Sequence, residues 1–208
     1  MKTDEPEGYV RIRVKMSLAP IYLQPILQLN VVWLIGKDGQ LELSVKADKC
    51  REMEIDLPRF GLRAELKKSM NRAVYYGYGP EESYVDKHRA SRMGLFETTA
   101  RDNFENYLKP QETGSHWNTY YASVTDEEGC GLKAESDKPF SFQILEYTQE
   151  ELTKKAHAFE LEKAAGTAVN FDYKMNGIGS NSCGPRLRKP YRFDEEKFSF
   201  RLRLTMLD

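Results

Sequence analysis

The sequence predicts an all-β chain that folds as an antiparallel sandwich. Two observations predict this class. Apolar residues alternate with polar ones in many short runs, and turn-forming residues separate the runs. Hydrophobic residues make up 40% of the 208 residues and aromatic residues 12%, which suits a packed globule rather than a disordered chain. A chain of this length is enough for one domain that buries roughly 70% of its unfolded surface.

The N-terminal part contains a first strand signal and then a break. Residues 10–16 alternate Val, Ile, Val and Met with Arg and Lys, as in a half-buried strand. Pro20 and Pro25 then interrupt the pattern, because proline cannot donate to a sheet ladder. We therefore expect 1–26 to be a connecting segment or edge strand, and 27–208 to form the main β-sandwich domain.

The strongest hairpin signal joins residues 27–35 to residues 41–47. Both runs alternate, and the turn between them contains Asp38-Gly39, which tolerates the positive φ of a tight turn. Residues 81–106 are charged and only weakly periodic, so we expect a long surface excursion there. The remaining alternating runs predict strands at 62–66, 73–78, 120–124, 132–134, 140–144, 169–173 and 198–204.

One segment predicts a helix. Thr148 precedes Glu151 by three residues, which is the capping-box pattern: the threonine hydroxyl accepts from the Glu151 amide while the glutamate side chain bonds back. Leu152 and Ala156 then lie one turn apart on the same face. The sequence therefore predicts a short helix at 149–156 that acts as a lid or plug on the sandwich.

Charge and cysteine content exclude several classes of function. The 31 Lys and Arg residues nearly balance the 32 Asp and Glu residues, so no strong field points to nucleic acid or membrane. The longest apolar run is too short to cross a bilayer. Three scattered cysteines without C-x-x-C pairing argue against disulfides or a zinc site. They suit a reducing compartment, so we expect a cytoplasmic protein without a leader sequence.

The stretch Met175–Pro185 follows an alternating run and contains Gly177, Gly179 and Gly184. Because glycine lets another backbone or a ligand approach closely, the stretch indicates a wide loop that displays its small polar residues. These residues are Asn181, Ser182 and Cys183. A glycine-rich connection without a role is the alternative interpretation. Cys183 has no neighbouring histidine that would activate it as a nucleophile.

A second candidate lies in the turn that contains Glu112, His116 and Trp117. A carboxylate, an imidazole and an indole in one turn are the mixture that sugar sites use for hydrogen bonding and ring stacking. The alternative is a buried Trp117 that anchors the turn. Paired glutamates elsewhere in the chain indicate solvated turns rather than a catalytic pair, because adjacent strand residues face opposite sides.

Several segments taken together resemble the C-terminal small-chain domain of β-galactosidases in glycoside hydrolase family two. The resemblance covers roughly residues 27–204, and the order of the segments makes it specific. The segments are Leu57–Arg63, Gly77–Asp86, Lys109–Gly114, Pro139–Phe142, Tyr147–Leu152, His157 and Gly177–Pro185.

This resemblance implies a galactose-mutarotase-like antiparallel supersandwich and a retaining β-galactosidase as the parent enzyme. It places the catalytic glutamates in a barrel domain or large chain outside this chain, so no residue here is catalytic and this chain alone is inactive. The loop with Asn181, Ser182 and Cys183 would line the aglycone side of the galactoside pocket. The resemblance also implies an oligomeric parent that uses Mg and Na in other domains, with no cofactor in this chain.

Three departures from the family pattern stand out. Cys183 occupies a position where the family often has tryptophan, so an indole platform for the aglycone is absent. Thr113–His116 replaces the usual Asn-Gly-Asn-Arg, which removes arginine-based contacts there. The tryptophan-arginine-alanine-proline run that begins the family domain is also absent, so we expect N-terminal strands of the family domain to be missing and a sheet edge to be left unpaired.

Two other functions fit the same predicted fold. A free-standing aldose 1-epimerase would use a glutamate base and a histidine acid, with Glu112 and His116 as candidates. A non-catalytic carbohydrate-binding or assembly module would bind sugar or dock to a partner without any reaction. Mutarotation of fresh galactose tests the first, and calorimetry with galactose and lactose tests the second.

Overall fold

The computed structural model describes residues 1–5, 8–51, 56–179 and 185–208. Every strand pairing is antiparallel, as the sequence predicts, and the described chain is all-β and sandwich-like apart from short helical turns. The elements are β1 (Lys2–Asp4), β2 (Tyr9–Leu18), β3 (Leu27–Gly36), β4 (Gln40–Lys49), β5 (Arg59–Leu66), β6 (Arg72–Gly79), β7 (Arg92–Thr99), β8 (Ser115–Thr125), β9 (Gly131–Leu145), α1 (Gln149–Lys154), η1 (Ala158–Glu160), β10 (Thr167–Met175), η2 (Lys189–Tyr191) and β11 (Lys197–Leu207).

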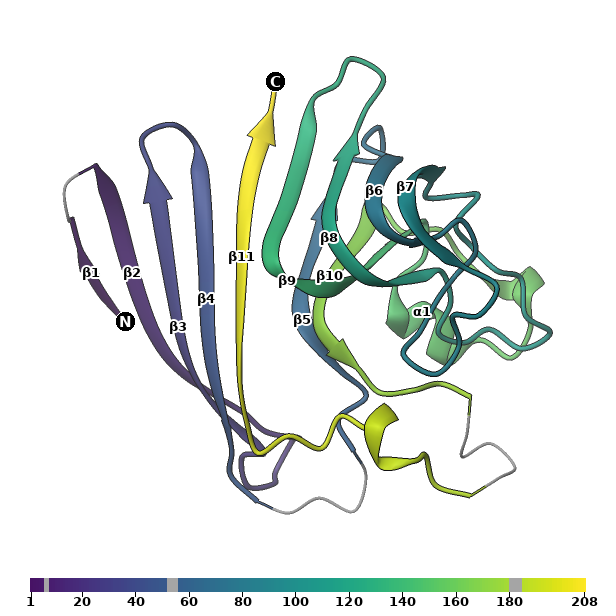
Figure 1. Ribbon diagram of the computed structural model, residues 1–208, viewed down its shortest axis with the longest axis horizontal. Coiled ribbons are helices and arrows are strands. Elements are labelled where there is room, and N and C mark those ends of the chain that lie inside the picture. The colour runs from purple at the N-terminus through teal and green to yellow at the C-terminus, as the bar shows by residue number, and fades with distance from the viewer. Residues whose placement is uncertain (6–7, 52–55, 180–184) are drawn as a thin grey trace.

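The sheet forks at β9. The beginning of β9 pairs with β11, and its end pairs with β10, while β8 lies along its other side. Figure 1 shows the result: β1, β2, β3, β4 and β11 stand side by side, and β8, β6 and β7 continue the sheet beyond β9. β10 and β5 form a third branch that starts from β9.

The β5–β10 branch packs across β11 through aromatic side chains. The Phe60 and Phe198 rings lie 4.9 Å apart edge to face, and Tyr173 stacks on Phe198 at 4.9 Å. One contiguous core of buried side chains runs through the inner faces of these layers. On β4, for example, Leu43 and Val45 are buried while Lys46 is exposed, which is the period-two alternation seen in the sequence.

Two strand predictions were wrong. Residues 81–106 are not only a surface excursion, because β7 (Arg92–Thr99) lies within them as an edge strand paired with β6. The runs 132–134 and 140–144 are one long strand, β9. The alternation breaks between them because β9 changes partner from β11 to β10 there, and Pro139 lies in that stretch.

The helix prediction was confirmed except at its C-terminal end. Thr148 caps α1, and its hydroxyl accepts from the Glu151 amide at 3.2 Å. The reciprocal half of the capping box differs from the prediction, because the Glu151 carboxylate accepts from the Glu162 amide at 2.9 Å. The helix ends at Lys154 because Lys155 already has an extended backbone.

Candidate functional site

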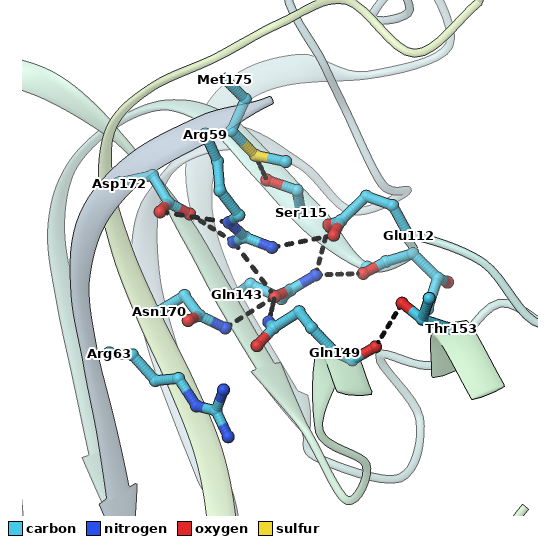
Figure 2. A network of polar contacts seen from close by, with 12 residues as sticks. Arg59, Arg63, Glu112, Ser115, Gln143, Gln149, Thr153, Asn170, Asp172 and Met175 are labelled. Carbon is cyan, nitrogen blue, oxygen red and sulfur yellow. Dashed lines mark hydrogen bonds and ion pairs between the residues drawn. The ribbon is translucent and has the colours of Figure 1, made fainter. Parts of the chain in front are cut away.

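A polar layer covers one face of β5, β9 and β10. Asn170 on β10 lies opposite Arg63 on one side and Gln143 on the other. Its side-chain amide donates to Gln143 Oε1 at 2.8 Å, and Gln149 from α1 donates to the same oxygen at 3.0 Å. Figure 2 shows these side chains pointing toward one another beneath the helix. The layer is polar because the opposite face of the strands supplies the apolar core.

Arg59 joins this layer to two carboxylates. Its guanidinium binds Asp172 through two nitrogens, with Nε 3.3 Å from Oδ1, and its other terminal nitrogen lies 2.8 Å from Glu112 Oε2. Gln143 Nε2 donates to Glu112 Oε1 at 2.5 Å (Figure 2). The planar guanidinium suits such a bidentate contact, which fixes geometry as well as charge. One partly buried cation therefore holds two carboxylates from distant parts of the chain.

Burial sets the protonation of this cluster. It raises the pKa of Glu112 to about 7, although the charge of Arg59 acts in the opposite direction. Burial also raises the pKa of Asp172 against the pull of Arg59. The Glu112 side chain is 23% exposed, whereas that of Asp172 is 4% exposed. Glu112 is thus the member of the pair that titrates near neutral pH and also reaches solvent.

Gly61 makes room for Asp172. A Cβ at Gly61 would lie 2.4 Å from the Phe171 carbonyl oxygen and 2.6 Å from Asp172 Oδ1. We expect Gly61→Ala to lower the free energy of unfolding by about 1–3 kcal/mol, the usual cost of overpacking. Urea unfolding measures it. Gly94→Ala is the control, because a Cβ there meets only the Phe96 ring, which can turn aside; an equal loss in both variants would contradict the packing argument.

His116 lies in the core rather than beside Glu112. Its Nε2 lies 2.6 Å from Asn103 Oδ1, its Nδ1 lies 3.2 Å from the Tyr78 carbonyl oxygen, and its ring stacks on Tyr75 at 4.0 Å. Burial lowers the pKa of His116 to about 4. Because both ring nitrogens are occupied within the fold, this arrangement does not support His116 as the acid of an epimerase.

Trp117 belongs to a third environment. Its ring stacks on His88 at 4.5 Å and contacts Tyr78 at 5.1 Å, and its amide donates to Ser83 Oγ at 2.9 Å. Trp117 also lines a narrow cavity of about 70 Å³ together with Tyr84. Glu112, His116 and Trp117 are therefore close in sequence but serve separate contacts.

Asn181, Ser182 and Cys183 lie outside the residues that the structure describes. The segment that leads to them is held firmly: the Asp86 carboxylate accepts from the Ile178 amide at 3.1 Å and from the Gly179 amide at 2.8 Å. A Cβ at Gly177 would meet the same carboxylate at 2.6 Å. The glycines predicted to allow a close approach thus admit a side chain from a distant loop.

Sequence patterns missed Arg59, Asp172 and Asp86. Two of them do lie inside the segments that carry the family resemblance, Arg59 in Leu57–Arg63 and Asp86 in Gly77–Asp86. Asp172 appears only as a polar residue of an alternating strand, and nothing local marks it as buried. Among the described residues, no three His, Cys, Asp or Glu side chains form a group that could hold a metal ion.

Taken together, these observations define an all-β sandwich-like domain with a forked antiparallel sheet. Its Arg59–Glu112–Asp172 cluster holds parts of the fold together. Comparison with known proteins then identifies its family. The family model described as "Beta galactosidase small chain" matches residues 1–204, and the chain belongs to this family.

Relatives support this assignment. A β-galactosidase of Actinobacillus pleuropneumoniae is 42% identical over 200 residues, 96% of this chain but 19% of that protein. One from Staphylococcus xylosus is 38% identical over 205 residues, 97% of this chain and 20% of that protein. A third, from Streptococcus thermophilus, is 34% identical over 155 residues. The chain thus spans about a fifth of the length of the curated relatives that match nearly all of it. No helix among the described residues is long and apolar enough to cross a membrane.

Proposed function

We propose that this chain is the C-terminal β-sandwich of a retaining β-galactosidase of glycoside hydrolase family two. It packs on a catalytic barrel that lies outside these residues and completes the aglycone side of the galactoside pocket. The observation that carries the proposal is the coverage: the match runs over 96% of this chain and only 19% of the relative. In the proposed enzyme, the remaining four-fifths contain the catalytic barrel on which this chain packs. The proposal includes a cytoplasmic, oligomeric parent enzyme and no cofactor in this chain.

The described carboxylates support a non-catalytic role for this chain alone. A retaining glycosidase needs two carboxyl groups about 5–5.5 Å apart that flank the sugar bond. Glu112 and Asp172 are close, but the Arg59 guanidinium occupies the space between them and binds both. Asp172 is also too buried to reach a sugar. Through Arg59 the two carboxylates therefore tie β5, β10 and the segment before β8 together rather than opening onto a substrate.

The segment that precedes residue 180 supports a role for the loop. Asp86 holds the amides of Ile178 and Gly179, and the Gly177 amide donates to the Tyr191 carbonyl oxygen at 2.9 Å. Two separate parts of the chain thus fix where the loop begins. In the proposed enzyme, Asn181 and Ser182 supply hydrogen bonds to the aglycone, and Cys183 forms a small wall in place of an indole.

A chimeric enzyme tests this function. The matching fifth of the Actinobacillus pleuropneumoniae β-galactosidase is replaced by this chain, and turnover of a chromogenic galactoside is measured. We expect the chimera to be active and the isolated chain to show no turnover. Cys183→Trp in the chimera should lower KM for aryl galactosides severalfold by adding a stacking face. The same substitution at Cys50, which is exposed and distant in sequence, is the control and should leave KM unchanged.

Two outcomes would contradict the proposal. Turnover by the isolated chain would mean that its own carboxylates are catalytic. If Cys183→Trp and Cys50→Trp changed KM equally in a folded chimera, the loop would not line the aglycone side of the pocket.

A further inference from the structure

The fork in the sheet leaves one side of β11 without a strand partner. The ladder between β9 and β11 ends at the pair Arg203–Glu135, and β9 next pairs with β10 from Ser141 onward. β4 remains paired with β11 along this stretch, but only on the other side. Figure 1 shows β9 turning away from β11 here. Residues 197–202 of β11 therefore present an unpaired edge toward the fork, as far as the described residues show.

Main-chain donors at this edge face the fork. Ser136 Oγ donates to the Arg201 carbonyl oxygen at 2.8 Å, so the main-chain polar groups of Arg201 point toward β9. In an antiparallel strand the N–H and C=O of one residue point to the same side, and every second residue repeats the direction. The N–H groups of Arg201 and Ser199 therefore point into the fork, where the β9 ladder has already ended.

A cavity of about 250 Å³ lies at the fork, and its walls are positively charged. Lys46, Lys138 and Arg201 line it, against a single acidic residue, Asp137. None of the three cations forms an ion pair with any described residue, although 15 ion pairs occur elsewhere. An excess of like charges in a hollow, here three cations against one carboxylate, raises the local concentration of anions.

Hydroxyl groups complete the lining. Ser44, Ser136, Ser199 and Tyr173 border the cavity. Because the Ser136 hydroxyl already donates to the Arg201 carbonyl oxygen, Ser44 and Ser199 are the serines that can donate to a ligand. Ser44 lies opposite Arg201 in the sheet register, and Lys46 lies opposite Ser199, so both strands place a cation next to a hydroxyl. Cations, hydroxyls and main-chain amides together are the donors that bind the oxygens of a phosphate group.

We propose that the cavity at the fork binds the phosphate group of a small molecule. A phosphate carries about two negative charges near pH 7 and three strong acceptor oxygens, which matches the excess of cations and donors. The cavity is larger than a bare ion requires, and Asp137 can accept from hydroxyls on an attached organic group. The inference about this cavity does not depend on the proposed function.

Isothermal titration calorimetry of the full chain at low ionic strength and pH 7.5 tests the proposal. The probes are inorganic phosphate, glucose 6-phosphate and glucose. We expect both phosphates to bind and glucose not to bind. Tighter binding of glucose 6-phosphate assigns the site to organic phosphates, and equal binding assigns it to free phosphate. No heat from either phosphate, or equal heat from glucose, overturns the proposal.

Matched variants locate the site. Lys46→Gln and Arg201→Gln should each weaken phosphate binding roughly tenfold, as expected for losing a charge-assisted hydrogen bond. Lys15→Gln removes the same charge from the same row of the sheet, because Lys15 and Lys46 both lie opposite Asn30. It should leave affinity unchanged. Equal weakening by Lys15→Gln and Lys46→Gln would show attraction to net charge alone and would overturn the site. Circular dichroism verifies that each variant is folded.

Discussion

Arg59→Met is expected to lower the free energy of unfolding by about 3–5 kcal/mol at pH 8, as for other buried ion pairs that lose one partner. The guanidinium is the shared partner of Asp172 and Glu112. Without it, Asp172 remains buried with an uncompensated charge, and the two carboxylates repel each other. Methionine keeps the length of the side chain, so the loss reports charge and hydrogen bonding more than packing. Urea unfolding with a constant m-value measures the change.

Arg63→Met is the matched control. Arg63 lies on the same strand and pairs with Glu150 at 2.7 Å, but its side chain is 42% exposed and that of Glu150 is 59% exposed. Exposed pairs contribute about 0–1 kcal/mol, so this variant should unfold almost like the wild type. If Arg59→Met lowered the free energy of unfolding as little as Arg63→Met does, Arg59 would contribute no more than a surface cation, and the prediction would be wrong.

The second prediction concerns the partly buried Glu112 and the buried His116, whose titrations oppose each other. Glu112 has a pKa of about 7 in the fold and about 4.5 when unfolded, so its contribution is present below pH 4.5 and is lost as pH rises to 7. His116 has a pKa of about 4 in the fold and 6.5 when unfolded, so its contribution is present above pH 6.5 and is lost as pH falls to 4. Each amounts to about 3 kcal/mol, at roughly 1.4 kcal/mol per pKa unit.

In the wild type these two slopes cancel, and we expect stability to stay nearly level between about pH 4.5 and 6.5. Glu112→Gln should expose the His116 slope, so that stability rises with pH by about 2 kcal/mol across this window. Urea unfolding at half-unit pH steps measures the profile. Glu150→Gln changes an exposed carboxylate of α1 and should leave the profile level. A level profile for Glu112→Gln would mean that His116 contributes no slope, whereas a wild-type profile that already rises with pH would mean that Glu112 is ionised throughout.

The sequence predicted most strands because core burial imposes alternation. The runs at 27–35 and 41–47 are confirmed as β3 and β4, joined by a turn with Gly39 at positive φ. β7 was missed because it is an edge strand, in which burial does not impose a regular alternation of apolar and polar residues. Leu95 is 66% exposed there, and Gly94 interrupts the pattern. Its position follows from backbone pairing with β6, which composition does not encode.

The candidate site was predictable only in part. Glu112 was found because its turn also contains an imidazole and an indole. Its partners Arg59 and Asp172 are far away in sequence and meet it through strand register. Likewise, nothing around His116 distinguishes an accessible imidazole from one enclosed by Tyr75 and Asn103. Local patterns identify residues that can do chemistry, whereas long-range pairing decides which of them meet and which are buried.

The pairing of β4 with β11 also has a consequence for biosynthesis. Val45 lies opposite Phe200, so β4 must await a strand that is translated much later in the chain. Until then this edge of β4 has no strand partner. Such non-local topologies fold slowly and expose apolar, aggregation-prone surface while they do so. A nascent chain halted before residue 197 should therefore stay sensitive to protease and recruit chaperones, whereas synthesis through β11 lets the domain close.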